Sequence, residues 1–529
     1  MASAQKRRSR KPFTANEAAI AHAGGNANSF GAGGERSGLR WEIFRKRFRY
    51  GAVAMVGNGK RIYFVGIGGV AMGNGAILAK SIGCEVFGSD GKLYAPMDSL
   101  LNSNGIAYAE EFNEKNIEEF RPDLVVVGNC IGRGNCEAEW LIDCGKFPLL
   151  SLPQFLFENF FIGRHRIVFS GTHGKTTSCA ACANYMRQQL AVPVGFFVGG
   201  SPIDFPVGAE IGKADAPFAI EGDEYDSAFF DKRSKFVHYA PNTAIIGGIE
   251  FDHWDIFRDL VDVERAFNHM VRTVPRSGRI FYNGDCPSAK KIAAVPWVRS
   301  HSVGLGAHNE FRIVDLTVKN SGTEWRILHG KGETAVSCSL CGEFNGRNCT
   351  MAVLAAHHSI GRALPDRVDL RSFSGVRRRQ SLLRNDGKCI VYEDFGHHPS
   401  AVREVLSAMR LRHPHCELIA CFEPASITSA SGVLAADFVG AFSLADRCYW
   451  ATATRRQANG GDGAAETVVS ALRSRGIDAA TFGNNGLLLD RLLAIVSAQS
   501  NRMPLIVLFS SGAFPVVLPH WKGSGDGSH

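Results

Sequence analysis

One segment constrains the fold of this chain more than any other. An apolar run at residues 167–169 leads directly into Gly-Thr-His-Gly-Lys-Thr-Thr at residues 171–177. A strand that ends in a glycine-rich turn and opens into a helix directs several backbone N–H groups at one point, where the helix dipole adds partial positive charge. Lys175 completes a cradle for phosphate, and Thr176 is placed to hold the magnesium ion that accompanies the terminal phosphates. The segment therefore predicts a strand–loop–helix unit that binds ATP or a close relative.

The loop is a shortened form of the usual phosphate-binding pattern, because Phe169 stands where that pattern has its first glycine. An ordinary glycine-bearing turn with a solvated lysine is the alternative. The strand, the loop, the Lys-Thr pair and the helix follow one another in the right order, which favours phosphate binding.

Length and composition indicate a multidomain protein. The 529 residues exceed what a single core accommodates, so three domains of ~150 residues each are expected. Hydrophobic residues make up 45% of the chain and charged residues 21%, which is typical of a globular protein. No apolar run reaches the ~18 residues that a membrane span needs, so no membrane partner is expected.

The net charge of +8 comes from the first part of the chain. Residues 1–59 hold eleven Lys and Arg against three Glu, so the remainder is neutral and gives no electrostatic case for a nucleic-acid partner. This segment could be a transit-type peptide, a basic arm or a disordered extension. Because it lacks the hydrophobic core of a secretory signal, we favour the extension.

The fourteen cysteines are scattered through predicted strands and helices, which suits a reducing compartment such as the cytoplasm. Two Cys-x-x-Cys pairs occur, Cys179/Cys182 and Cys338/Cys341. Zinc sites place such pairs much closer together in the sequence than these are. The pairs are therefore interpreted as ordinary core cysteines.

The region before the phosphate loop has the pattern of a Rossmann-type domain. A buried strand at 61–65 leads into Gly66, Gly68 and Gly69, and a second strand ends in Asp90. A glycine-rich turn at a helix start lets a diphosphate approach the backbone, although the pattern alone is weak evidence for a dinucleotide.

The region after the phosphate loop places carboxylates at strand ends. An apolar strand at 218–220 leads into the acidic run 221–226, which begins with Glu221, and a strand at 243–246 leads towards Glu250 and His253. Metal ligands belong at the carboxyl ends of such strands beside a phosphate loop. A solvated acidic loop is the alternative, which the neighbouring Lys-Thr pair makes the weaker interpretation.

The last third has strands at 389–394, 418–423 and 505–509 with helices between them, so it predicts a further α/β domain. Arg379 ahead of this region offers a guanidinium group suited to phosphate oxygens. His397 and His398 precede Pro399, which is placed to begin a helix, so packing and chemistry are both open interpretations for these histidines.

Taken together, these motifs resemble the Mur ligase family, the ATP-dependent amide-forming enzymes of peptidoglycan assembly. The resemblance runs from about Arg61 to about Pro515. The family-wide motifs are Gly-Ile-Gly-Gly at 66–69, the loop at 171–177, Asn345-x-x-Asn348, and Asp394 ahead of His397-His398-Pro399. The run 221–239, with support from 250–253 and 422–424, is similar to the recycling branch of the family, which joins UDP-N-acetylmuramate to a tripeptide.

The resemblance implies roles for individual residues. The catalytic residues would be Lys175, Glu221 and His253, and Mg²⁺ would be held by Thr176, Glu221 and His253. The residues expected to bind ATP are Gly171, Thr172, His173, Gly174, Lys175, Thr176, Thr177, Asn345, Asn348, Arg379 and Asp394. Those expected to lie against the UDP-sugar are Gly66, Gly68, Gly69 and Asp90.

The resemblance also implies the domain organisation of an α/β protein with three domains. A Rossmann-like domain that binds the UDP-sugar is expected at 60–160, a central ATP-binding domain at 161–373, and a Rossmann-like acceptor-binding domain at 374–517. The basic extension at 1–59 and a polar tail at 518–529 would flank them.

The activity implied is ADP-forming ligation of UDP-N-acetylmuramate to the tripeptide L-alanyl-γ-D-glutamyl-meso-diaminopimelate through an acyl phosphate. Three features depart from the branch pattern: Gly248 and Ser511 replace asparagines, and Ala425 and Ile427 replace an arginine and an asparagine. Two alternatives therefore stay open. One is a ligase that takes L-alanine or another acceptor, and the other is a non-catalytic protein that binds ATP and a UDP-sugar.

Overall fold

The computed structural model describes residues 57–93, 96–253, 256–424, 432–451, 462–498, 500–512 and 514–522. The predicted basic extension, apart from residues 57–59, therefore lies outside the described residues. The same holds for Ala425 and Ile427, two of the positions that depart from the branch pattern.

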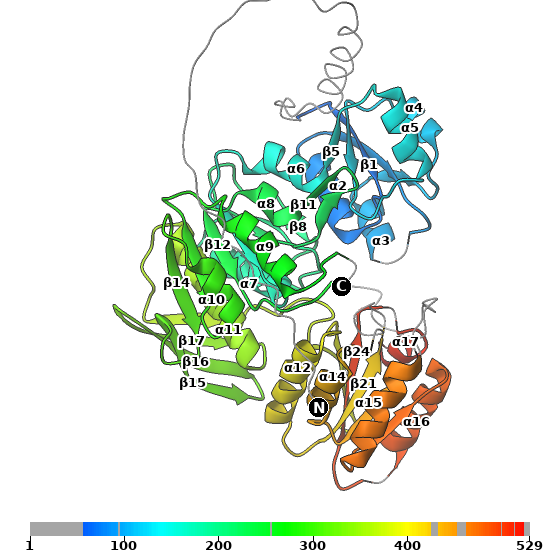
Figure 1. Cartoon of the computed structure of the whole chain (residues 1–529), viewed down its shortest axis with the longest axis vertical. Helices are drawn as coiled ribbons and strands as arrows, with labels where there is room; N and C mark the ends of the chain where they lie inside the picture. Colours follow the sequence, from blue (N-terminus) through cyan, green and yellow to red (C-terminus); the bar gives the residue numbers. More distant parts are fainter. Residues whose placement is uncertain are drawn as a thin grey trace, which may run out of the picture. The chain divides into compact units, whose positions relative to one another are not determined.

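The first sheet is entirely parallel and has the order β3-β2-β1-β4-β5, which begins like a Rossmann sheet. Its central strand alternates buried apolar side chains between two faces, with Ile62 on one and Tyr63 on the other. Helices α2, α3 and α6 cover the first face, and α4 and α5 cover the second (Figure 1). The elements are β1 (Arg61–Val65), α2 (Val70–Ser81), β2 (Glu85–Ser89), α3 (Met97–Ser103), β3 (Ala107–Ala109), α4 (Glu114–Phe120), β4 (Leu124–Val127), α5 (Cys136–Cys144), β5 (Leu149–Ser151), α6 (Leu152–Leu156) and the π-helical turn η1 (Phe157–Phe161).

The central sheet has the order β18-β17-β16-β15-β14-β13-β12-β6-β9-β7-β8, and a separate two-stranded sheet joins β10 and β11. The strands from β13 to β7 are parallel, whereas β15, β16 and β17 pair antiparallel. The strands are β6 (Arg166–Ser170), β7 (Gly195–Phe197), β8 (Ala209–Glu210), β9 (Phe218–Glu221), β10 (Asp226–Ala228), β11 (Asp231–Ser234), β12 (Thr243–Ile246), β13 (Arg279–Asn283), β14 (Arg299–Gly304), β15 (Phe311–Lys319), β16 (Gly322–His329), β17 (Gly332–Cys338) and β18 (Arg367–Leu370).

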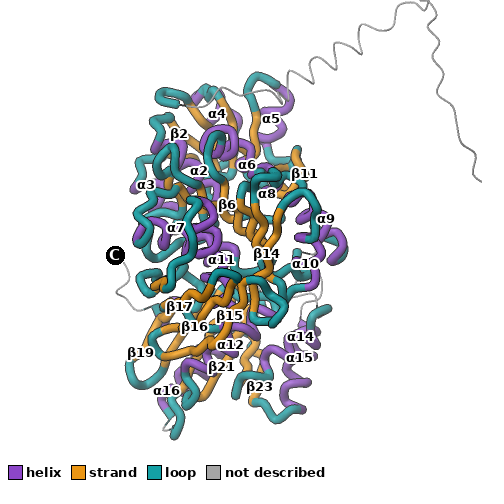
Figure 2. Tube along the Cα trace, turned by 90° about the vertical axis from the view of Figure 1, so that its left-hand side faces the viewer, coloured by secondary structure: helices purple, strands orange, loops and turns teal. Residues whose placement is uncertain are grey.

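Helices cover both faces of this sheet, which explains why its parallel strands are continuously apolar. In β6, Ile167 and Phe169 pack with α7 and α11, whereas Val168 packs with α8, α9 and α10. Figure 2 shows β6 and β14 between the α7 and α11 pair and the α9 and α10 pair. The helices are α7 (Lys175–Gln188), α8 (Lys235–Tyr239), α9 (Leu260–Val271), α10 (Pro287–Ala293) and α11 (Glu343–Ser359).

The third sheet has the order β19-β20-β24-β21-β22-β23, with only β19 antiparallel to its neighbour. Helices α12, α14 and α15 pack on one face, and α16 and α17 pack on the other. The elements are β19 (Ser381–Asn385), β20 (Ile390–Asp394), α12 (Pro399–Arg412), β21 (Glu417–Glu423), α14 (Ala435–Phe442), β22 (Arg447–Trp450), α15 (Asp462–Ser474), β23 (Asp478–Thr481), α16 (Asn485–Ser497), β24 (Pro504–Ser510) and α17 (Val517–Trp521).

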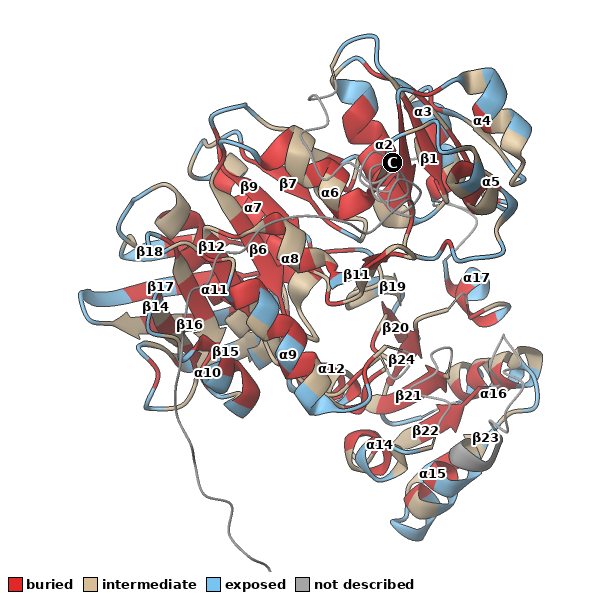
Figure 3. Ribbon diagram, turned by 45° about the horizontal axis from the view of Figure 1, so that its top comes forward, coloured by how far each residue is buried: buried red, intermediate tan, exposed pale blue. Residues whose placement is uncertain are grey.

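The predicted α/β class with three sheet-containing regions is confirmed, and buried residues follow the strands of all three large sheets (Figure 3). One boundary needs correction. The polar tail was predicted to begin at residue 518, but Leu518 and Trp521 are buried in the core between α16, α17 and the third sheet. The apolar side chains of this short helix pack into the core. The polar residues that follow in the sequence had indicated a tail instead. Within the described ranges, no helix combines the length and the apolar character that crossing a membrane requires.

Candidate active site

The phosphate loop lies between the end of β6 at Ser170 and the start of α7 at Lys175. Gly171 and Gly174 have φ values of +134° and +80°, a backbone region that side chains disfavour. A Cβ atom on Gly174 would also lie 2.3 Å from Asn348 Oδ1. Glycine is therefore required at residue 174 both by the turn and by the close approach of helix α11.

Lys175 points back into this loop and is paired with a buried carboxylate. Its Nζ donates to the Gly171 carbonyl at 2.8 Å and to Glu224 Oε2 at 2.8 Å. Burial opposes the positive charge, but Glu224 and Asp223 outweigh it and raise the pKa of Lys175. The chain therefore holds a protonated ammonium group at the place where a phosphate chain would lie.

Thr176 and Glu221 form an oxygen-rich pair beside the lysine. The Thr176 hydroxyl donates to Glu221 Oε1 at 2.8 Å, and the Gly199 N–H donates to Glu221 Oε2 at 2.8 Å. Hydroxyl and carboxylate oxygens are the donors that Mg²⁺ prefers, so these residues fit the predicted ion.

His253 is brought to the same site by an unusual backbone conformation, with a φ value of +62°. Its Nε2 lies 3.3 Å from Glu224 Oε1, and its Nδ1 lies 2.8 Å from the Tyr225 hydroxyl. Burial would lower the pKa of His253, but Glu224 and Asp252 outweigh it and raise the pKa. Glu224 thus links His253 to Lys175, whereas Thr176 and Glu221 contact each other directly.

The predicted base-binding residues lie on α11. Asn345 Nδ2 donates to the Cys341 carbonyl at 2.8 Å, and Asn348 Nδ2 donates to Asn345 Oδ1 at 3.4 Å. The Asn348 amide is therefore held beside Gly174, one residue before the lysine.

Arg379 and Asp394 approach from the C-terminal region. The Arg379 guanidinium lies over the Phe395 ring, 4.8 Å from its centroid. Asp394 accepts hydrogen bonds from the N–H groups of Gln380 at 2.9 Å and Gly396 at 2.7 Å, and burial raises its pKa. The carboxylate therefore holds together the two segments that carry this side of the site.

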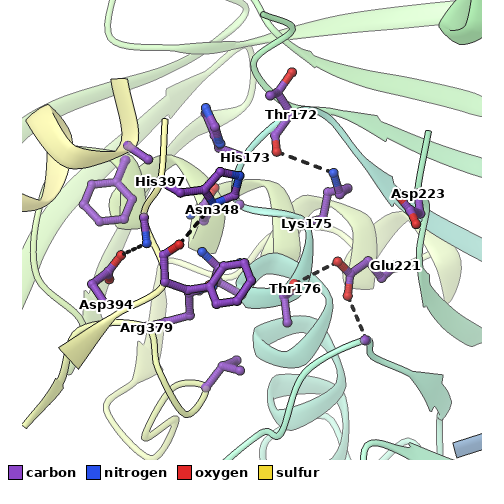
Figure 4. A pocket seen from close by; sticks show the side chains of 18 of the residues that line it. Thr172, His173, Lys175, Thr176, Glu221, Asp223, Asn348, Arg379, Asp394 and His397 are labelled. Atoms are coloured by element: carbon purple, nitrogen blue, oxygen red, sulfur yellow. Dashed lines mark hydrogen bonds between the residues drawn. The ribbon is translucent and has the colours of Figure 1, made fainter. Parts of the chain in front are cut away.

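These groups surround a cavity of about 350 Å³. Every predicted ATP-binding residue except Gly171 lines it, together with Glu221 and His253. Figure 4 shows the labelled side chains of the phosphate loop and of the C-terminal region facing the same space. His397 is also part of the lining, with its Nε2 3.7 Å from Asp252 Oδ2.

The predicted UDP-sugar residues lie elsewhere. Gly68 N–H donates to Asp90 Oδ2 at 2.8 Å, and Gly66 N–H donates to the Ser89 carbonyl at 2.8 Å. Asp90 therefore closes the glycine turn after β1. Neither Asp90 nor Gly66, Gly68 and Gly69 belongs to the lining of the cavity, whereas Ala71 of α2 does.

Comparison with known proteins decides the family. The Mur ligase middle domain matches residues 169–356, and the domain described as Mur ligase family, catalytic domain, matches residues 61–156. A UDP-N-acetylmuramate–L-alanyl-γ-D-glutamyl-meso-2,6-diaminoheptandioate ligase of Escherichia coli (strain K12) is 40% identical over 393 residues, which are 74% of this chain and 84% of that protein. The chain belongs to the Mur ligase family.

Two further proteins are similar to a larger part of this chain. The ligase of the same name from Haemophilus influenzae is 35% identical over 86% of this chain and 97% of its own length. The crystal structure of a murein peptide ligase from Psychrobacter arcticus covers 88% of this chain and 99% of its own, with a TM-score of 0.63 and 28% sequence identity. The similarity therefore spans all three sheets.

Sequence reasoning missed one central residue of this Mur ligase. Glu224 is almost fully buried and contacts both Lys175 and His253. It stands in the acidic run 221–226 that was identified as a group of candidate metal ligands. The acidic run pointed to this region, but the sequence does not show which of its carboxylates is buried.

The Cys-x-x-Cys pairs of the Mur ligase are core residues, as predicted. All four cysteines are buried, two of them in α7. Burial raises the pKa of Cys341 to about 11 and raises that of Cys182 as well. The burial of all four side chains fits a packing role.

Proposed function

We propose that this Mur ligase joins the carboxylate of UDP-N-acetylmuramate to the amino group of L-alanyl-γ-D-glutamyl-meso-diaminopimelate, with ATP converted to ADP and phosphate. The observation that supports it most is the 40% identity to a ligase of that name over 84% of its length. Substrates of this kind, small nucleotides and a peptide, place the reaction in the cytoplasm and require neither nucleic acid nor membrane.

The chemistry requires an activated carboxylate. A carboxylate is resonance-stabilised and does not accept an amine, so the muramoyl carboxylate first takes the γ-phosphate of ATP and forms an acyl phosphate. The tripeptide amine then attacks the acyl carbon, the new amide bond forms, and phosphate leaves. Lys175 is placed to neutralise charge on the phosphate that is transferred.

The remaining groups position and balance this charge. Thr176 and Glu221 would hold Mg²⁺ with His253 near them, and the ion would supply charge neutralisation at the phosphates. Glu224 holds Lys175 and His253 in place before substrate arrives, and its charge favours the protonated form of both. Arg379 would meet phosphate oxygens, Asp394 would meet the ribose, and Asn345 and Asn348 would lie along the base.

The N-terminal glycines Gly66, Gly68 and Gly69 would lie against the UDP diphosphate, with Asp90 shaping their turn. Water would hydrolyse an acyl phosphate. The cavity lining draws on the N-terminal, central and C-terminal regions, here represented by Ala71, Lys175 and Asp394, so several segments of the chain can shield the reacting atoms.

A mass-spectrometric assay tests the proposal directly. The protein is incubated with UDP-N-acetylmuramate, ATP and either the tripeptide, L-alanine or a panel of other amino acids. We expect the tripeptide adduct together with stoichiometric ADP. An L-alanine adduct in its place would establish a different acceptor, and nucleotide binding without ADP release for any acceptor would overturn ligation.

A further inference from the structure

We infer that His173, Glu250 and His398 form a binding site for a zinc-type transition-metal ion, separate from the predicted magnesium position. The residues come from three distant segments. His173 belongs to the phosphate loop, Glu250 follows strand β12, and His398 is the residue before helix α12. Nothing in the ligase reaction proposed above requires such an ion at this place.

The distances from the Glu250 carboxylate to the two imidazoles fit tetrahedral coordination. One atom of each residue lies within 4.8 Å of the other two. Glu250 Oε2 lies 3.3 Å from His173 Nε2 and 3.1 Å from His398 Nδ1. Zinc bonds to nitrogen and oxygen are about 2.0–2.1 Å long, so neighbouring ligand atoms of a tetrahedron lie about 3.3 Å apart. The Glu250 carboxylate therefore already lies at the spacing of a metal ligand from both imidazoles.

The Ser400 hydroxyl also belongs to this cluster. The Ser400 hydroxyl lies 3.2 Å from His173 Nε2 and 2.7 Å from His398 Nδ1, and it donates to Glu250. It lies closer to His398 and to Glu250 than the about 3.3 Å that separates tetrahedral ligands, so it hydrogen-bonds within the cluster. A bound ion would turn this hydroxyl aside, and the hydroxyl or a water molecule would then provide the fourth ligand. The competing explanation is a purely hydrogen-bonded cluster around the same hydroxyl, and the experiment below separates the two.

Backbone contacts hold the ligands in position. The Glu250 N–H donates to Thr172 Oγ1 at 2.9 Å, and the Thr172 N–H donates to the Gly248 carbonyl at 2.7 Å. The Glu250 segment is thus attached to the residue before His173. Supporting contacts of this kind fix the orientation of metal ligands and raise their affinity.

The donor set also selects the ion. Two imidazoles and one carboxylate suit Zn²⁺, Co²⁺, Ni²⁺ and Cu²⁺, whereas Mg²⁺ prefers oxygen ligands only. Because His173 lies in the phosphate loop and His398 directly precedes α12, a bound ion would join the central region to the C-terminal region. Opening of the nucleotide cavity would then require release of one ligand.

Metal titration of the untagged, full-length, metal-free protein tests this site without relying on activity. We expect one equivalent of Co²⁺ to give the visible absorption of a tetrahedral nitrogen–oxygen site, with no thiolate charge-transfer band, and Zn²⁺ to displace it in excess Mg²⁺. Competition with a chromophoric chelator then gives the Zn²⁺ affinity. Loss of a supporting contact alone costs ~10- to 100-fold, so Glu250→Gln and His398→Gln should each weaken binding by at least about 100-fold.

His415→Gln is the matched control, because it removes an exposed imidazole from the same region and should leave the Zn²⁺ affinity unchanged. Circular dichroism and thermal melting establish that each variant is folded. If His398→Gln does not fold, the wild-type cobalt spectrum and Glu250→Gln still decide. A wild-type protein without the tetrahedral spectrum, or a folded variant that binds Zn²⁺ as tightly as wild type, overturns the site and leaves the hydrogen-bonded cluster.

Discussion

Buried ionisable side chains have different partners at the two ends of the central parallel strands. At the carboxyl end, Lys175 Nζ and His253 Nε2 lie 2.8 and 3.3 Å from the same buried carboxylate, that of Glu224. At the amino end, the Thr243 hydroxyl lies 2.7 Å from His165 Nε2 and 2.8 Å from His358 Nδ1. One end therefore pairs charge with opposite charge, and the other joins two imidazoles through a neutral hydroxyl.

The pKa values follow this difference. Burial, helped by neighbouring positive groups, lowers the pKa of His165 and of His358 to about 4. Burial acts on His253 too, but Glu224 and Asp252 reverse its effect and raise the pKa. Burial alone therefore does not distinguish the functional end of the sheet. The functional end is distinguished by carboxylates that compensate the charge of buried cations.

The largest effect is expected when the ion pair between Lys175 and Glu224 is broken. Lys175→Ala should lower kcat/KM at least about a thousandfold, because it removes charge stabilisation in the transition state. It should also cost about 3 kcal/mol of stability, since the buried carboxylate of Glu224 loses one of its two cationic partners. ADP release and thermal melting measure the two effects.

The matched control for this prediction is Lys175→Met with Glu224→Gln, which removes both charges. It should recover the melting temperature without recovering turnover. Near-normal turnover in Lys175→Ala would refute the role assigned to the phosphate loop.

Removing the charge of Glu224 should make a histidine at the carboxyl end titrate more like those at the amino end. In Glu224→Gln, burial and the charge of Lys175 should bring the pKa of His253 down towards the behaviour of His165. In wild type the pKa of His253 is raised, so its pairing stabilises the protein fully below pH ~6.5 and is lost as pH rises through the raised pKa. The variant should lose this stabilisation on the acid side.

Histidine NMR titration measures this change, with His253→Gln to assign the resonance. An unchanged pKa of His253 in Glu224→Gln would show that Glu224 is not what raises it.

The third effect is expected at the amino end, and it concerns stability. The pKa values of His165 and His358 are lowered to about 4, so the unfolded chain takes up protons that the native state does not. Stability should therefore fall as pH drops from ~6.5 to ~4, by up to about 3 kcal/mol for each histidine. His165→Gln with His358→Gln should flatten this part of the curve in denaturant unfolding.

The exposed-residue variant His415→Gln should keep the wild-type pH dependence and serves as the control. Parallel curves for wild type and the double variant would mean that the acid sensitivity arises elsewhere.

The smallest expected effect concerns a glycine at the carboxyl end. A Cβ on Gly248 would meet nothing within 4 Å, so Gly248→Asn should change stability by less than about 0.5 kcal/mol and leave the KM for ATP unaltered. Gly174→Ala is the contrasting variant, because its Cβ would lie 2.3 Å from Asn348 Oδ1 at a φ of +80°. That variant should raise the KM for ATP in steady-state titration. Equal behaviour of the two variants would contradict the close packing of α11 on the phosphate loop.

Contiguous motifs were the part of the site that sequence could predict. Gly171, Gly174, Lys175 and Thr176 are neighbours in the chain, and the turn that they form is dictated locally by glycine conformation and by the start of a helix. The alternation of short apolar strands with helices likewise predicted α/β regions, because strands buried on both faces appear as continuous apolar runs. The departure at residue 518 shows the limit, since a short apolar helix near a polar end carries little pattern.

What only the tertiary structure decided is which distant side chains meet. Glu224 stands among several carboxylates, and the fold alone turns it inward to Lys175 and His253. His173 and Ser400 are 227 positions apart, yet their side chains are in hydrogen-bonding contact. The sequence by itself determined the local turns, the strand and helix pattern and the family. Pairings across the chain depend instead on how strands order in the sheets and on where buried charges find partners, because the free energy of a buried charge is set by neighbours that no local pattern encodes.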